Sequence, residues 1–237
     1  HLSIRRQRQM CIRDRPQAAG ELQRSGPEET TYLQYTSGST MFPRGVVITQ
    51  SAVLSNLAGA ANHGIDVRAD DRGVSWLPFY HDMGLVGCML APMASQRSMD
   101  YLDPRDFAMR PRRWLELMTR TRATFSFGPP FGYGLCVRRI RPEDVAQYDL
   151  RAWRVAGIGA EPIREDVPEQ FARLLAPAGF DRRAFVPCYG MAEASLAISF
   201  SPLGQGVIVE RVDADHLTHA LQARPANAQT ARVSSLV

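Results

Sequence analysis

Short apolar runs alternate with longer amphipathic segments through the middle of the chain. Runs rich in β-branched and aromatic residues predict strands at residues 31–35, 73–77, 97–102, 123–127, 153–158 and 184–188. Apolar spacing of three and four residues predicts helices at residues 50–62, 82–93, 111–120 and 165–176. This alternation predicts an α/β fold of layered, largely parallel sheets with flanking helices.

Polar or glycine-rich segments follow four of the predicted strands. TSGST follows TYLQY, PFYHDMG follows VSWL, GAEP follows VAGI, and YGMAEA follows FVPC. Parallel sheets bind ligands beyond the carboxyl ends of their strands. We therefore expect these four loops to share one face.

Composition and charge narrow the class of protein. The apolar share of 45% and charged share of 22% are ordinary for a soluble globular protein of 237 residues. The five Arg and one Asp of residues 1–15 account for the whole net charge of +4, so no basic face for nucleic acid is expected. Residues 1–27 are expected to form a basic arm, solvated and disordered or artefactual, because IRRQRQMCIRDR resembles translated adaptor sequence. Residues 214–237 lack apolar periodicity and are expected to be poorly ordered.

All 28 basic residues are Arg, so the chain itself offers no lysine for a Schiff base or for a phosphate contact. Four scattered cysteines without a C-x-x-C pair favour reduced, mostly buried thiols and a cytoplasmic location. The longest apolar run, residues 83–94, is too short to span a bilayer.

The loop TSGSTMFPRG offers closely spaced hydroxyls and backbone amides, which suit a phosphate. It is no Walker A loop, because it lacks the lysine and runs into the β-like VVIT rather than a helix. Taken alone, it could equally be a plain surface turn.

In the second segment, WLPFYHDMGL, one His stands beside one Asp, which alone is weak evidence for a base or a metal site. The chain has no G-x-S-x-G elbow, which argues against an α/β-hydrolase. The pair His216 and His219 lies in the unpatterned tail and is a poor metal candidate.

The segments GIGAEP and CYGMAEA carry the remaining candidates. Tyr189 could stack on a base, and Glu193 could hold Mg²⁺ beside phosphates. The alternative is a buried Tyr and a Glu favoured at a helix start by the helix dipole.

The order YTSGST…PRGV, FYHDMGL, GAEP, YGMAEA resembles the adenylate-forming enzymes, a superfamily of acyl-CoA synthetases, peptide-synthetase adenylation domains and luciferases. FYHDMGL and YGMAEA are most similar to the fatty acyl-AMP ligase branch. The resemblance covers about residues 28–213 and implies the central part of the large N-terminal domain of such an enzyme. Met41, Arg44 and Ala192 stand where many relatives have glycine, lysine and threonine, and such variation is consistent with this branch.

The resemblance implies ATP-dependent activation of a long-chain fatty acid to an acyl-adenylate, with Mg²⁺ as cofactor. The implied roles are as follows: Arg44 and His81 are catalytic; Thr36, Ser37, Gly38, Ser39, Thr40 and Gly45 surround the β- and γ-phosphates; Gly159, Ala160 and Glu161 line the adenine pocket; Tyr189 packs on adenine; Gly190, Met191 and Ala192 pass the α-phosphate; and Glu193 binds Mg²⁺. The run FSFGPPFGYGL suggests an acyl pocket at Phe127, Gly128, Pro129 and Phe131, although ordinary core packing explains it as well.

The family's ribose-binding aspartate and its C-terminal lysine domain have no counterpart here, so we expect this chain alone to be inactive. The expected partners are the fatty acid and an acyl-carrier protein or polyketide synthase, without nucleic acid or stable membrane insertion. Two alternatives stay open: part of an acyl-CoA ligase, or a non-catalytic nucleotide-binding remnant.

Overall fold

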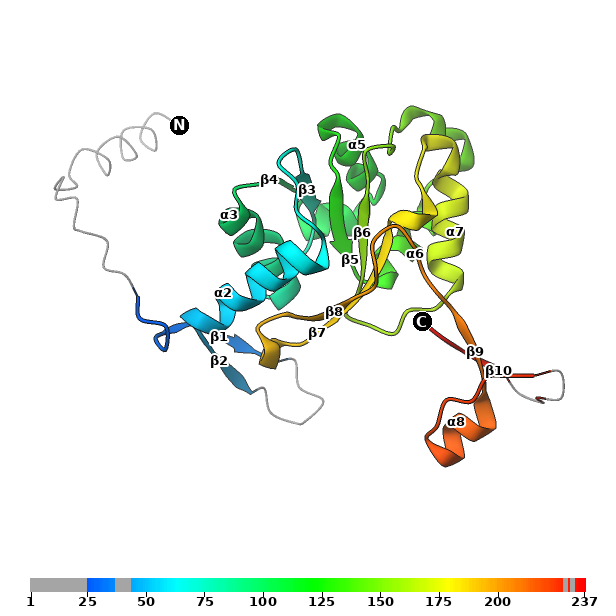
Figure 1. Cartoon of the computed structure of the whole chain (residues 1–237). Helices are drawn as coiled ribbons and strands as arrows, with labels where there is room; N and C mark the ends of the chain where they lie inside the picture. The colour runs from blue at the N-terminus through cyan, green and yellow to red at the C-terminus, as the bar shows by residue number, and fades with distance from the viewer. Residues whose placement is uncertain (1–24, 37–43, 228–229, 231–232) are drawn as a thin grey trace.

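A six-stranded sheet with helices on both faces forms the centre of the molecule (Figure 1). The computed structural model describes residues 25–36, 44–227, 230 and 233–237. The strand order is β4–β3–β5–β6–β7–β8, and all neighbours pair in parallel except β7 and β8. The strands are β3 (Arg72–Ser75), β4 (Ser98–Tyr101), β5 (Phe125–Gly128), β6 (Val155–Gly159), β7 (Phe185–Gly190) and β8 (Ala197–Phe200). The predicted α/β fold with a largely parallel sheet is confirmed.

The helices that follow the strands belong to two layers. Against one face pack α4 (Pro104–Met109), α5 (Arg112–Thr121), α6 (Pro130–Arg139) and α7 (Asp166–Leu175). On the other side lie α2 (Gln50–Gly59), η1 (Ala60–Gly64), η2 (Met83–Leu90) and α3 (Ala91–Ser95), of which η1 and η2 are π-helices. The four predicted helices are confirmed, two of them as composite helices: α2 with η1, and η2 with α3. Short 3₁₀ turns complete the set: η3 (Pro142–Gln147), η4 (Ala176–Ala178), η5 (Arg182–Ala184) and η6 (Ala192–Ala194).

An aromatic cluster fills the core on the α5–α7 side. The Trp114 indole is fully buried and donates its Nε1–H to Ser126 Oγ at 3.0 Å, and Ser126 in turn donates to the Val74 carbonyl at 2.6 Å. Tyr133 is also fully buried and donates its hydroxyl to the Gly157 carbonyl at 2.9 Å. These bonds satisfy the polar atoms that burial of such large rings would otherwise leave unpaired. The bonds also join helices α5 and α6 to strands β3, β5 and β6.

Two small hairpins stand apart from the main sheet. Strands β1 (Thr30–Tyr35) and β2 (Gly45–Thr49) are antiparallel, and Thr49 caps α2 by accepting from the backbone N–H of Ala52. Strands β9 (Glu210–Asp213) and β10 (Val233–Leu236) form the second pair, with helix α8 (Ala214–Ala220) between them. Helix α8 and strand β10 lie within residues 214–237, and the division of the chain at residue 213 stays a prediction.

Candidate functional site

A cavity of about 190 Å³ lies between the helices α2, η1 and η2 and the ends of the central strands. It brings together residues from three of the four polar loops: His81 from the loop after β3, Ala160 from the loop after β6, and Tyr189 with Gly190 at the end of β7. The expectation that these loops share one face is met by these residues. Parallel strands carry their following loops to one edge, which explains the convergence.

Most of the cavity wall is apolar. Side chains from both layers contribute: Leu57, Ala60, Ile65, Met83, Val86, Ala91, Phe127, Leu196 and Phe200. The polar groups, Asn56, His81, Asp82 and Tyr189, come from α2, the loop after β3 and the end of β7. An apolar wall with a few polar groups is typical of a site for a ligand with a hydrocarbon part.

His81 stands half-exposed at this site with a carboxylate beside it. Its Nδ1 lies 2.8 Å from Asp82 Oδ1, and Asp82 is mostly buried. The hydrogen bond to Asp82 raises the pKa of His81 above its ordinary value, despite partial burial, which acts the other way. Gln34 of β1 donates to the carbonyl of Tyr80 at 3.2 Å, which holds the backbone just before His81.

Glycines allow two close approaches of backbone at this edge. A Cβ on Gly159 would lie 2.2 Å from the Cys188 carbonyl oxygen, and one on Gly190 would lie 2.0 Å from that of Leu196. Any side chain at either position would push the strands apart, so the sequence needs glycine there. Ala160, directly after Gly159, has φ of 67°, a left-handed conformation that is uncommon for alanine.

The YGMAEA segment turns back at the end of β7. Tyr189 is 61% exposed, so its ring is free to meet a ligand. Met191 donates its backbone N–H to Leu196 at 2.8 Å, Ala192 is buried, and Glu193 is exposed in the short helix η6. Its exposed position leaves the Glu193 carboxylate accessible to a cation.

The phosphate-loop residues lie only partly within the described structure. Ser37, Gly38, Ser39 and Thr40 fall outside the described residues. Thr36 and Arg44 lie at the loop end of the β1–β2 hairpin, where the Thr36 N–H donates to the Arg44 carbonyl at 2.9 Å. Gly45 pairs with Tyr35 in the same hairpin. The roles of these residues toward phosphate stay predictions.

Glu161 and three of the predicted acyl-pocket residues lie elsewhere. The Glu161 carboxylate accepts from the backbone N–H of Phe131 at 2.6 Å and so caps the start of α6. Phe127 lines the cavity, whereas Pro129 precedes α6 as its N-cap. A Cβ on Gly128 would meet Trp76 at 3.1 Å, and the Phe131 ring packs edge-on against the same indole at 5.7 Å.

Sequence reasoning missed most of the cavity wall. Residues such as Asn56, Val86 and Phe200 belong to helices and a short edge strand with no motif of their own. The apolar run 83–94 was the available signal for the η2 wall. The other wall residues line the cavity because of how the helices pack against the sheet, which no local pattern indicates.

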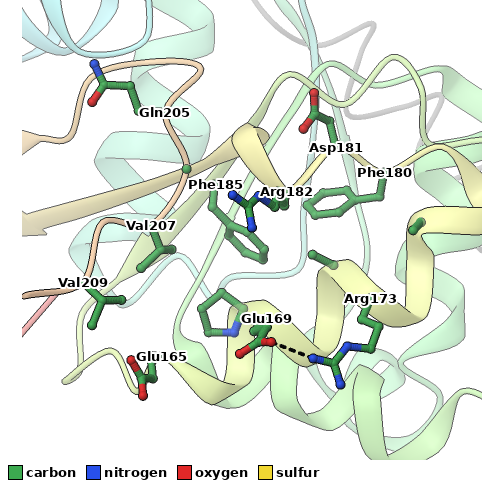
Figure 2. Close-up of a pocket in the computed structure, with 14 residues that line it drawn as sticks. Glu165, Glu169, Arg173, Phe180, Asp181, Arg182, Phe185, Gln205, Val207 and Val209 are labelled. Carbon is green, nitrogen blue, oxygen red and sulfur yellow. Dashed lines mark hydrogen bonds and ion pairs between the residues drawn. The ribbon is translucent and has the colours of Figure 1, made fainter. Parts of the chain in front are cut away.

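A second cavity, of about 550 Å³, lies between α7 and the segment 205–209 (Figure 2). Charged and apolar side chains both line it, and Glu169 pairs with Arg173 across one turn of α7 at 2.6 Å. Its lining contains none of the predicted site residues. The chemistry implied by the polar loops therefore belongs to the smaller cavity.

Metal and membrane features are sparse in the described part of the chain. Among these residues no group of three or more His, Cys, Asp or Glu side chains could hold a metal ion. The described cysteines Cys88, Cys136 and Cys188 are free thiols, and burial raises the pKa of Cys88 to about 11 and that of Cys188 to about 12. No helix in the described segments is long and apolar enough to cross a membrane.

The family model described as "AMP-binding enzyme" matches residues 5–228. The chain belongs to the AMP-binding enzyme family. The match begins within residues 1–27, which are expected to form a basic arm outside the family domain. The boundary of that arm at residue 27 stays a prediction.

Individual relatives agree with this assignment. A Caulobacter vibrioides protein with a provisional acyl-CoA synthetase name is 44% identical over 87% of this chain and 36% of its own length. A medium-chain-fatty-acid–[acyl-carrier-protein] ligase of Teredinibacter turnerae is 41% identical over 73% of this chain and 27% of its own length. The chain spans about a third of the length of the curated relatives that it matches.

A solved structure shows the same fold. It comes from studies of fatty acyl-adenylate ligases from E. coli and L. pneumophila, and is 53% identical with a TM-score of 0.89. The match covers 93% of this chain and 40% of the other. The described structure therefore corresponds to part of an AMP-binding domain.

Proposed function

We propose that this chain forms the central part of an enzyme that activates a fatty acid with ATP, giving an acyl-adenylate and pyrophosphate. The observation that carries the proposal is the cavity itself, where an apolar wall meets His81, Ala160, Tyr189 and Gly190 of the family loops. The Teredinibacter ligase and the fatty acyl-adenylate ligases of the solved structure support a fatty acid as substrate.

In the proposed step a carboxylate oxygen of the fatty acid attacks the α-phosphorus of ATP. A new oxygen–phosphorus bond forms, the bond between the α-phosphorus and the bridging oxygen breaks, and pyrophosphate leaves with the electron pair. The protein positions the two reactants and neutralises charge, with no covalent bond to its own side chains.

Each site residue has one task in this scheme. The exposed Tyr189 ring offers a face for the adenine. His81, whose pKa is raised by the hydrogen bond to Asp82, lies at the junction of carboxylate and phosphate, where its protonated form would offset negative charge. Arg44, at the loop end of the β1–β2 hairpin, reaches the terminal phosphates, where its guanidinium can donate two hydrogen bonds.

Mg²⁺ fits this site as an ion shared with the substrate. In the turn after β7, Glu193 is the one carboxylate, and it is exposed. Among the described residues no group of three or more His, Cys, Asp or Glu side chains could bind the ion by itself. Mg²⁺ commonly binds through one or two carboxylates together with substrate phosphates and water. When bound, it would offset negative charge on the phosphates.

The acyl group would then pass to an acyl-carrier protein. The name of the Teredinibacter relative favours this acceptor, whereas the name of the Caulobacter relative favours coenzyme A. Single-turnover transfer from the acyl-adenylate to each acceptor, with both offered at equal concentration, separates these two candidates.

ATP–pyrophosphate exchange tests the proposal. It is measured with a series of fatty acids from octanoate to palmitate, on this chain and on the full-length product of its gene. Exchange that depends on the fatty acid supports the enzyme. Absence of exchange with every acid in the full-length product would leave only a non-catalytic nucleotide-binding protein.

A further inference from the structure

The side chain of Asn56 joins helix α2 to the turn that carries Glu193. Its Nδ2 donates to the carbonyls of Ala194 at 2.9 Å and Ala197 at 2.8 Å. Its Oδ1 accepts from the backbone N–H of Ala197 at 3.1 Å. One carboxamide therefore makes three hydrogen bonds to backbone that lies about 140 residues further along the chain. Figure 1 shows the end of the β7–β8 hairpin lying beside α2.

The position of β8 in the sheet explains why these backbone groups need a partner. Strand β8 is the edge strand, paired on one side with β7. The N–H and C=O of Ala197 both bond to Asn56, which acts as a short substitute for a further strand. Paired in this way, the N–H and C=O of Ala197 form their hydrogen bonds within the protein.

The turn between η6 and β8 is strained and needs external support. Ser195 is 3% exposed and has φ of 69° and ψ of −49°, which is the region of a rare, strained γ-turn. The Met191 N–H donates to Leu196 and the Ser195 N–H donates to Ala192, which closes the turn on itself. Strained backbone of this kind persists only where surrounding contacts hold it, and Asn56 provides three of them.

The same helix is continuous with the hairpin of the hydroxyl-rich loop. Strand β2 ends at Thr49, which caps α2, and Asn56 lies in the next turns of this helix. The carboxamide thus connects the Thr36–Arg44 hairpin to the turn of Glu193, through one rigid helix. The cavity also touches Asn56, Tyr189 and Gly190 together.

We propose that Asn56 is a positioning residue of the nucleotide site, which fixes the Glu193 turn (residues 191–197) against helix α2. The hydrogen bonds of Asn56 are independent of the proposed function. The expected effect on nucleotide binding rests on it. Loss of the two amide donors frees residues 191–197 from helix α2, so the position of the Glu193 carboxylate relative to the Thr36–Arg44 hairpin is no longer fixed.

Hydrogen exchange of the backbone amides tests the contact without any ligand. Asn56→Asp keeps the shape of the side chain and the oxygen that accepts from Ala197. It replaces the NH₂ donor by a carboxylate oxygen, which repels the carbonyls of Ala194 and Ala197. We expect the amides of residues 191–199 to exchange about tenfold faster, while those of β5 and β6 stay unchanged. Asn62→Asp, at an exposed position of η1, is the matched control and leaves both sets unchanged.

Two results would overturn this contact: unchanged exchange at residues 191–199, or equal acceleration across the whole sheet. If Asn56→Asp does not fold, Asn56→Ala serves for the same comparison. It removes the donors without adding charge and keeps a good helix-forming residue in α2.

ATP binding, measured by calorimetry with Mg²⁺ and with EDTA, tests the consequence. We expect Asn56→Asp to reduce the gain in affinity due to Mg²⁺ about tenfold, with a smaller change in EDTA. Equal losses in both conditions would overturn the positioning role. If the unsubstituted full-length product binds no ATP at all, the proposed function fails together with this role, and the exchange comparison still decides whether Asn56 holds the turn.

Discussion

The imidazole of His81 and the carboxylate of Asp82 lie 2.8 Å apart in the lining of the candidate site. Asp82 also accepts from the backbone N–H of Met83 at 2.7 Å, so its orientation is fixed by the start of η2. The same Met83 N–H lies 3.2 Å from Nδ1 of His81, so the start of η2 holds both side chains of the pair.

We predict that Asp82→Asn lowers the pKa of His81. The pKa is raised in the folded chain, so the interaction stabilises the fold at pH values below the ordinary value of 6.5. This contribution is lost as the pH rises through the raised pKa. Titration of the His81 ring proton by NMR measures the shift, with His63, an exposed residue of η1, as the internal reference. A pKa of His81 that is unchanged in the variant contradicts the assignment.

The buried pair of Asp71 and Arg154 gives a prediction about stability. Burial acts to raise the pKa of Asp71, but hydrogen bonds from Arg154, Thr124 and the Arg68 backbone outweigh it and lower the pKa. We expect Asp71→Asn to cost about 3–5 kcal/mol, because it leaves the largely buried Arg154 without its counter-charge. Urea unfolding measures the loss.

The exposed neighbour Asp70 offers the control, since Asp70→Asn should change the free energy of unfolding little. The Asp71 contribution is present above the ordinary pKa of 3.8 and fades as the pH falls through the lowered value. Equal stability of the two variants at pH 7 would count against the buried pair.

Two glycines should respond in opposite directions to the same substitution. Gly159→Ala places a Cβ 2.2 Å from the Cys188 carbonyl oxygen and should destabilise by about 1–3 kcal/mol. Gly59→Ala in α2 meets nothing within 4 Å and should stabilise by about 0.5–1 kcal/mol. Thermal unfolding of both variants measures the difference, and a neutral Gly159→Ala would show that β6 and β7 lie further apart.

The cavity wall predicts a dependence on acyl-chain length. Ala60→Leu adds bulk to the wall and should weaken binding of a dodecanoyl-adenylate analogue about tenfold, because buried methylene groups are lost. An acetyl-adenylate analogue, which needs little apolar space, should bind nearly as before. Ala58→Leu, at an exposed position on the same helix, is the control. Equal losses for both analogues would place the acyl chain elsewhere.

Glu193 gives a prediction about Mg²⁺. Glu193→Gln keeps the size of the side chain and removes its charge, so the Mg²⁺ concentration needed for ATP binding should rise at least about tenfold. Glu210→Gln, at an exposed position of β9, should leave it unchanged. Unchanged dependence on Mg²⁺ in Glu193→Gln would remove this residue from the metal site.

The sequence predicts the central strands well because buried parallel strands are continuous apolar runs. Strands β6 and β7 and the glycines that end them follow from this pattern and from family motifs. Strand β8 escapes prediction, because AISF is a short edge strand with half of its residues exposed.

The cavity wall escapes prediction for a different physical reason. Asn56 reads as an ordinary helical residue, and its partners lie 138 and 141 residues away, so only the packed layers reveal its role. Phe200 likewise has no local signal, although a Cβ on Gly64 would come within 2.6 Å of its ring. Motifs locate the polar groups of the site, whereas tertiary packing decides which apolar residues surround them.

The most direct measurement is the hydrogen-exchange footprint of a non-hydrolysable dodecanoyl-adenylate analogue, an acyl sulfamoyl adenosine, on this chain. The proposed site predicts protection of residues 53–65, 81–91 and 188–200, which contribute most of the cavity wall. Residues 205–209 and helix α7, around the second cavity in Figure 2, should stay unchanged. Protection confined to that second cavity, or none at a saturating concentration, would contradict the account.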